Sequence, residues 1–219
     1  MKHTNSPINT LFLLQSLDWK ICSWYSWDTW KLSSWREFAK IVWLQDWVNQ
    51  YYELEQQTDL HSLNTWRNMK IIWANRKDFV LNVYSEVSFI IIDSSHLSET
   101  WVLNLAKWLK KLYLVTTNPN HPVFKIKENF KNIEIIFYKD SIDFVDLMNK
   151  LKNIYKIKNI TIQSGWTLNY ELLQNNLIDK ISIVIAPVLI WWKDTPTLID
   201  WKSWANSKKS VLESYKFLL

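Results

Sequence analysis

Glycine is nearly absent from this chain of 219 residues, which has a single glycine, Gly165, beside 16 tryptophans. An average soluble protein contains about 7% glycine, which would be about fifteen residues here. Cysteine is just as scarce, because Cys22 is the only one, and this excludes a disulfide framework and a cysteine-based metal site. The histidines are scattered without the spacing of metal ligands. We therefore expect no metal centre.

Long hydrophobic runs are missing as well. No apolar stretch reaches the length of a membrane span, and residues 8–14 are too short for a signal peptide and lack a cleavage pattern. The net charge is +5, and the lysines alternate with acidic residues, which is typical of a solvated surface rather than a nucleic-acid-binding stripe. We expect a cytoplasmic protein without membrane or nucleic-acid partners, whose mild positive field favours a phosphorylated small molecule.

The tryptophans that are present occupy positions where glycine is expected. Many lie in polar, turn-like stretches, such as Leu17–Lys20, Ser23–Trp30, Trp191–Asp194 and Asp200–Trp204. Turns favour glycine because it adopts positive φ without steric cost, an advantage that tryptophan lacks. Our hypothesis is that most of these codons are UGA, which some bacterial lineages read as glycine. Trp108, in a helical stretch, is a candidate for a genuine tryptophan, and the alternative is a tryptophan-rich binding protein.

Strand and helix patterns alternate along the whole chain and predict an α/β fold in one domain, residues 1–219, with a mostly parallel sheet. An antiparallel strand or two is expected near the C-terminus. The predicted strands are Ile8–Leu17, a short strand within 59–67, Val87–Asp93, Lys111–Thr117, Ile133–Tyr138, 159–163, Lys180–Pro187 and Val211–Leu219. The predicted helices are 36–57, 97–109, Phe144–Ile154 and 167–177.

The segment 160–177 is the clearest functional signal in the sequence. A short β-branched strand ends at Ser164-Gly165, and Thr167 is expected to cap the helix that follows. Free backbone N–H groups and the positive end of the helix then point to one spot, which favours an anion. Trp166 is out of place there, because a phosphate needs bare backbone.

Several motifs, read with glycine at 166, 191, 192 and 201, resemble a known family when they are taken together. They are Gln163–Asn169, Ala186–Leu198 and Ile199–Ser203, and Ser16–Ile21 adds a fourth when Trp19 is read as glycine. They resemble the reductase domain of bacterial riboflavin biosynthesis, in the dihydrofolate reductase-like superfamily. The resemblance covers nearly the whole chain. It implies a mixed, mostly parallel sheet flanked by helices, a homodimer, NADPH as hydride donor and a ribosylaminopyrimidine phosphate as substrate.

The resemblance also implies roles for particular residues. Asp18 would lie beside the nicotinamide and the substrate, and Gln163 would touch the substrate. Residues expected to bind the cofactor are Thr65, Trp66, Arg67, Asp93, Ser94, Thr116, Thr117, Ser164, Gly165, Trp166, Thr167 and Leu168. Ala186-Pro187 and Trp191-Trp192 would form the far wall of the groove.

The sequence departs from the family at Gln163, where many relatives have a glutamate that touches the substrate. An amide still forms hydrogen bonds but carries no charge, so the substrate stays open, and a pteridine reductase is the close variant. The family's deaminase zinc motif does not occur in this sequence, and we expect a stand-alone reductase. A second class of function is a non-enzymatic protein whose tryptophans stack on ligands or single-stranded nucleic acid.

Overall fold

The structure is a computed structural model that describes residues 5–20, 45–66, 69, 74, 76–78, 84–190 and 197. Its elements follow in the order β1 (Ile8–Ser16), α2 (Gln45–Glu55), β2 (His61–Thr65), β3 (Ser85–Ile92), α4 (Glu99–Trp108), β4 (Leu109–Thr116), α5 (Val123–Lys127), β5 (Ile133–Phe137), α6 (Phe144–Asn153), β6 (Asn159–Gln163), α7 (Trp166–Gln174) and β7 (Lys180–Ala186). The predicted alternation of strands and helices is confirmed over these ranges. The strand predicted at Val211–Leu219 and the start of the helix predicted at 36–57 lie outside the described residues.

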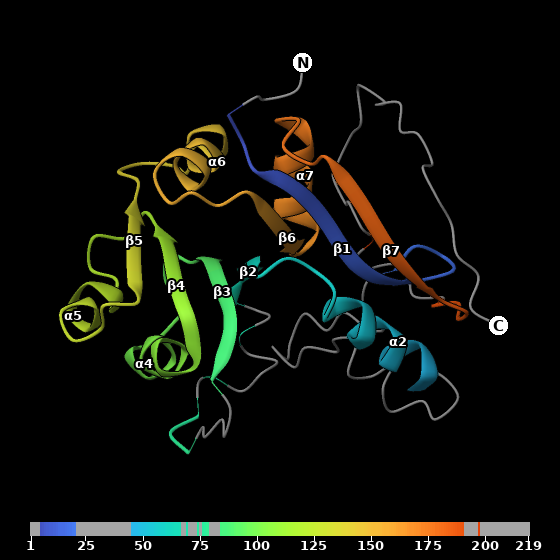
Figure 1. Cartoon of the computed structure of the whole chain (residues 1–219), viewed down its shortest axis with the longest axis horizontal. Helices are drawn as coiled ribbons and strands as arrows, with labels where there is room; N and C mark the ends of the chain where they lie inside the picture. Colours follow the sequence, from blue (N-terminus) through green and yellow to red (C-terminus); the bar gives the residue numbers. More distant parts are fainter. Residues whose placement is uncertain are drawn as a thin grey trace.

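The strands form one seven-stranded sheet in the order β5-β4-β3-β2-β6-β1-β7 (Figure 1). Every pair of neighbouring strands in it is parallel. The chain runs outward from β2 to β5, returns to insert β6 between β2 and β1, and then adds β7 beyond β1. Among the described residues, antiparallel pairing occurs as an isolated bridge between Lys20 and Thr197.

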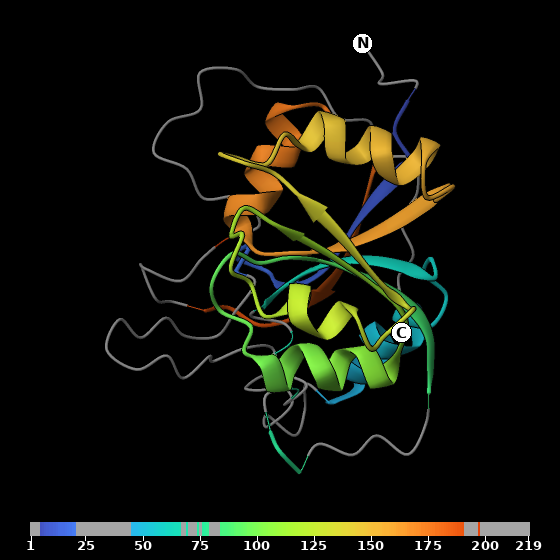
Figure 2. The same cartoon turned by 90° about the vertical axis from the view of Figure 1, so that its left-hand side faces the viewer.

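Helices cover both faces of the sheet, as Figure 2 shows in side view. On one face, α6 and α7 bury Leu147, Met148, Leu151 and Leu172 against β1 to β6. On the other face, α4 and α5 pack over β3, β4 and β5, while α2 packs over β1 and β7 through Tyr51 and Leu54. Helix α2 therefore lies on the face of the sheet opposite α7.

Local sequence explains two helix starts. Asp143 caps α6 by accepting hydrogen bonds from the backbone N–H groups of Val145 and Asp146, which satisfies donors that have no partner within the helix. The prediction that Thr167 caps α7 is wrong. Gly165 is the N-cap, α7 begins at Trp166, and the exposed Thr167 lies in the first turn.

The described tryptophans differ in their surroundings. Trp101 is 7% exposed and belongs to the core under α4, and Trp108 makes an edge-to-face contact with Phe89. Trp19, by contrast, is 62% exposed. Trp108 therefore packs as the sequence predicts for a genuine tryptophan, and Trp101 packs in the same way.

Candidate functional site at the carboxyl edge of the sheet

The carboxyl ends of the parallel strands gather most of the sequence-predicted site residues. In open parallel sheets, ligands bind outside these ends where the direction of winding reverses. The reversal here lies at β6, which returns between β2 and β1. Thr65, Asp93, Thr116, Ser164 and Asp18 end or follow β2, β3, β4, β6 and β1, respectively.

Asp18 lies in a tight turn that follows β1. Its Oδ1 accepts a hydrogen bond from Ser16 Oγ at 2.6 Å and one from the backbone N of Ile190 at 2.9 Å. Burial would raise the pKa of Asp18, but the hydrogen bonds from Ser16 and Ile190 lower it overall. Asp18 thus joins the ends of β1 and β7 and presents a carboxylate there.

Trp19, the next residue, has a φ of 66°, in the left-handed region. A side chain with a Cβ is strained in that conformation, whereas glycine is not. The turn is fixed around it, because Trp19 N donates to Ser16 O at 3.1 Å and Lys20 N donates to Ser16 Oγ at 2.9 Å. The backbone conformation at position 19 therefore favours glycine, which is the residue that the sequence pattern predicts there.

The start of α7 has an open side. Among the residues that the structure describes, no side chain caps this end of the helix, and a Cβ at Gly165 would have no heavy atom within 4 Å. Ser164 does not fill the space, because its Oγ turns inward and donates to Asn169 Oδ1 at 2.6 Å. The positive end of the helix dipole therefore favours an anion here, with Thr167 and Leu168 in the first turn.

Gln163 lies at the end of β6, on the face covered by α2. Its Oε1 accepts a hydrogen bond from Ser62 Oγ at 2.9 Å, and its Nε2 donates to Tyr51 Oη at 3.1 Å and to Glu55 Oε1. Ser62 Oγ in turn accepts from Asn64 Nδ2 at 2.8 Å. The amide is therefore held by protein groups from α2 and β2.

Asp93, after β3, has a fully buried side chain. Its carboxylate accepts hydrogen bonds from the backbone N–H groups of His96 and Leu97, and the rings of His96 and His121 lie at 2.9 and 3.0 Å. Burial would raise the pKa of Asp93, but the hydrogen bonds from His121, Leu97 and His96 lower it overall. The buried carboxylate therefore holds the loop after β3 in place from inside the protein. The backbone around Ser94 forms the outer side of this loop.

His121 is buried, and its protonation follows from its partners. Val123 N donates to its Nδ1 at 3.1 Å, so Nδ1 carries no proton and Nε2–H donates to Asp93. The ring therefore ties the loop after β4 to the end of β3.

The remaining cofactor candidates form a row beside Asp93. Ser94 Oγ and Thr117 Oγ1 lie 3.0 Å apart, and Thr116 is buried with its Oγ1 accepting from Asn118 N at 3.1 Å. Trp66, which follows Thr65, stacks on the ring of His96 with centroids 4.1 Å apart. Arg67, Trp191 and Trp192 lie outside the described residues.

Sequence reasoning missed Tyr51, Glu55 and His96 as members of this region. Tyr51 and Glu55 are four positions apart, so they share one face of α2, and that spacing was the available signal. His96 follows a strand end by four positions and had no distinctive pattern around it. The described residues contain no cluster of three or more metal-ligating side chains and no helix long and apolar enough to cross a membrane.

The fold and this edge together define a doubly wound α/β domain with the start of α7 at its switch point. Residues 32–214 match the family model described as the RibD C-terminal domain, so the chain belongs to this family, the pyrimidine reductases of riboflavin biosynthesis. The fold is accordingly dihydrofolate reductase-like.

Individual relatives are distant. The 2,5-diamino-6-ribosylamino-4(3H)-pyrimidinone 5′-phosphate reductase of Methanothermobacter thermautotrophicus is 34% identical over 58 residues, which cover 26% of this chain and 27% of that protein. The reductase of the same name from Aquifex aeolicus is 27% identical over 92 residues, 41% of this chain and 39% of that protein. The chain thus aligns with well under half the length of these relatives.

Solved structures share the fold. RibD of Acinetobacter baumannii superposes with a TM-score of 0.57 at 17% identity, covering 94% of this chain and 53% of that chain. The Saccharomyces cerevisiae riboflavin biosynthesis reductase Rib7 gives a TM-score of 0.55 at 16% identity, covering 94% of this chain and 84% of that chain.

Proposed function

We propose that this chain is an NADPH-dependent reductase of a ribosylaminopyrimidine 5′-phosphate. The observation that carries the proposal is the start of α7 at the switch point, where the described residues supply no side-chain cap and place no heavy atom within 4 Å of a Cβ at Gly165. Dinucleotide cofactors and this substrate class both carry phosphate, and helix starts of this kind bind phosphate. The names of the relatives supply the substrate class.

The residues present fit a dinucleotide along the carboxyl edge. In this proposal Ser164, Gly165, Trp166, Thr167 and Leu168 hold the phosphates through backbone groups. The adenosine end lies against the ends of β2, β3 and β4, at Thr65, Trp66, Ser94 and Thr117, with Asp93 and Thr116 buried at the same strand ends. Arg67, which lies outside the described residues, stays a candidate from the sequence. When bound, NADPH supplies the hydride, and the chain orients the substrate and excludes water. Asp18 then lies beside the nicotinamide.

The test is a fluorescence titration of NADPH into three versions of the chain. One is the sequence as written, one has glycine at all 16 tryptophan positions, and one keeps Trp101 and Trp108, which pack in the fold. We expect tight binding by the third version and weak binding by the first, because Trp166 puts a large side chain in the first turn of α7, where the phosphates are proposed to bind. A folded glycine version that does not bind NADPH would contradict the reductase.

Turnover assays then separate the substrates. The proposal predicts oxidation of NADPH with ribosylaminopyrimidine phosphates and not with dihydrofolate. Activity with dihydrofolate alone would favour the pteridine reductase instead. The proposal also includes a homodimer located in the cytoplasm. Sedimentation of the active version checks whether it is a dimer.

A further inference from the structure

One polar cluster on the α2 side of the sheet is not explained by cofactor binding. Tyr51 and Glu55 project from one face of α2 towards the end of β6, where Gln163 donates a hydrogen bond to each. Tyr51 is anchored by its ring, which stacks on Phe12 of β1 with centroids 4.9 Å apart. The cluster therefore lies between α2 and the neighbouring strands β1 and β6.

The hydrogen bonds in the cluster run in one direction. Asn64 donates to Ser62, Ser62 donates to Gln163, and the Gln163 amide donates to Tyr51 and Glu55. Because both polar ends of its amide are engaged, Gln163 is fixed and acts as a positioning residue.

Two groups at the end of this chain of hydrogen bonds remain available. Within the described part of the protein, neither the phenol hydrogen of Tyr51 nor the Oε2 atom of Glu55 has a hydrogen-bond partner. Both residues are half-buried, so water is partly excluded from them. A donor and an acid held side by side at a strand end form a site for an oxygen of a small molecule.

The surroundings of Glu55 favour its protonated form. Burial raises the pKa of the Glu55 carboxyl, and the hydrogen bond from Gln163 opposes this only in part. The titratable neighbours are Tyr51 on α2, whose own pKa burial raises, and Asp59 in the connection to β2, which Thr161 holds. Among the described residues, Gln163 on β6, which donates to Glu55, and Ser62 on β2, which donates to Gln163, carry no charge.

We infer that Glu55 is the acid that delivers a proton to the substrate during reduction and that Tyr51 orients the oxygen that receives it. This inference rests on the proposed function. A hydride from NADPH adds to the ribosyl carbon, which is thereby reduced by two electrons, and NADP⁺ is formed. The bond between that carbon and the ring oxygen breaks at the same time. That oxygen takes the proton of Glu55, and the resulting carboxylate is reprotonated from solvent. Gln163 holds both groups in register.

The experiment uses whichever version of the chain binds NADPH and turns over. Glu55→Gln should lower kcat by about 100-fold or more, the range for loss of a general acid, while the Kd for NADPH stays unchanged. In the unsubstituted chain kcat/KM should fall as pH rises through the pKa of Glu55, and the variant should lose this limb. Tyr51→Phe should raise KM by about tenfold, the effect of one hydrogen bond.

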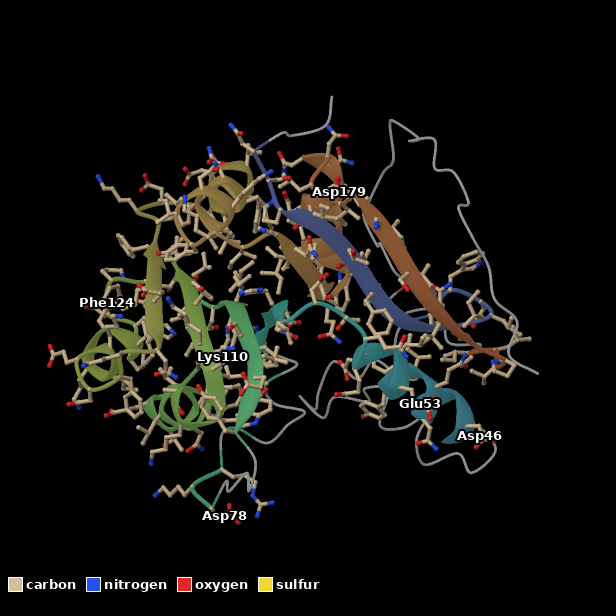
Figure 3. All side chains as sticks on the ribbon, in the orientation of Figure 1. Asp46, Glu53, Asp78, Lys110, Phe124 and Asp179 are labelled. Atoms are coloured by element: carbon tan, nitrogen blue, oxygen red, sulfur yellow. The ribbon has the colours of Figure 1, made fainter. Side chains whose placement is uncertain are left out.

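Glu53→Gln is the matched control, because Glu53 is an exposed carboxylate on the same helix (Figure 3), and it should leave kcat unchanged. A second readout is thermal stability. Glu55→Gln should raise Tm at pH 8, where ionised Glu55 opposes folding, and should not raise it near pH 4; a merely structural acid predicts a loss instead.

If the Glu55→Gln variant kept its turnover and the same pH profile, the role of Glu55 as the acid would be contradicted, while the proposed reductase function would stand. Absence of turnover with bound NADPH in the unsubstituted chain would contradict the proposed reductase, and the inference would fall with it.

Discussion

At the scale of single residues, backbone conformation carries information that composition only suggests. Trp19, Lys156 and Asn176 are the described non-glycine residues with positive φ. Asparagine tolerates this region well, and tryptophan does not. The excess of tryptophan in the sequence and the left-handed turn at position 19 are independent observations, and both indicate glycine there.

Replacing Trp19 with glycine should stabilise the fold. Relief of left-handed strain is worth about 1 kcal/mol, and the exposed ring loses little burial. Denaturation by urea should show a higher midpoint for Trp19→Gly. Trp101→Gly is the control, because it empties a core position and interrupts α4, and it should cost about 4 kcal/mol. A lower midpoint for Trp19→Gly would argue for a genuine tryptophan.

Asp93 should govern stability in acid. Its pKa is lowered in the folded state, so its contribution is present above the ordinary aspartate pKa and is lost as pH falls through the folded value. Asp93→Asn should cost about 3 kcal/mol at pH 7, because a buried, bonded charge is removed. The difference from the parent chain should shrink as pH falls below the ordinary aspartate pKa and through the lowered folded value.

Urea titrations at several pH values measure this effect. Asp78→Asn is the control, since Asp78 lies on the surface, labelled in Figure 3, paired with Arg76, and should show no such loss. An Asp93→Asn variant as stable as its parent at pH 7 would refute the role assigned to the carboxylate.

At the scale of elements, regular strands and helices could be predicted because each has its own periodicity. Leu147, Met148 and Leu151 of α6 follow the spacing of one helix face, and all three are buried. The short α5 could not be predicted, because five residues show too little of a helical period. The predicted start of α7 was wrong because threonine is favoured as an N-cap residue for its side-chain oxygen. The helix instead begins at Trp166, with Gly165 as its N-cap.

Site residues were predictable where the chemistry is local and not where it depends on distant contacts. Ser164 and Gly165 follow directly from a strand, a turn and a helix. Glu55 meets Gln163 across 108 positions of sequence, and only the order of strands brings α2 over β6. Whether a glutamate on a helix is solvated or buried depends on that order.

The start of α7 allows stability and binding to be separated. Thr167→Asp places a negative charge in the first turn, which should stabilise the helix by about 0.5 kcal/mol through its dipole. The same charge should repel a phosphate and raise the Kd for NADPH by about tenfold. Thr167→Asn is the neutral control of the same size. Unchanged affinity in Thr167→Asp would place the phosphates elsewhere.

At the scale of the whole molecule, the net charge of +5 produces only a weak electrostatic field, because the charged residues are mostly dispersed along the chain. Salt screens such a field beyond about 10 Å at 0.1 M. The association rate for NADPH should therefore fall modestly, by about two- to threefold, between 0.05 and 0.5 M salt. Stopped-flow fluorescence measures this rate, and a much steeper fall would indicate a concentrated basic patch.

The late insertion of β6 beside β1 has a consequence for how the protein is made. Asn9, at the start of the chain, hydrogen-bonds to Asp179, 170 positions later, and β1 gains both neighbours only from β6 and β7. During synthesis, the first strand therefore leaves the ribosome long before its partners exist, with two unpaired edges and a row of apolar side chains. Contacts of such high sequence separation slow folding and expose intermediates to aggregation. The nascent chain should depend on chaperones that shield β1 until nearly the last strand has been translated.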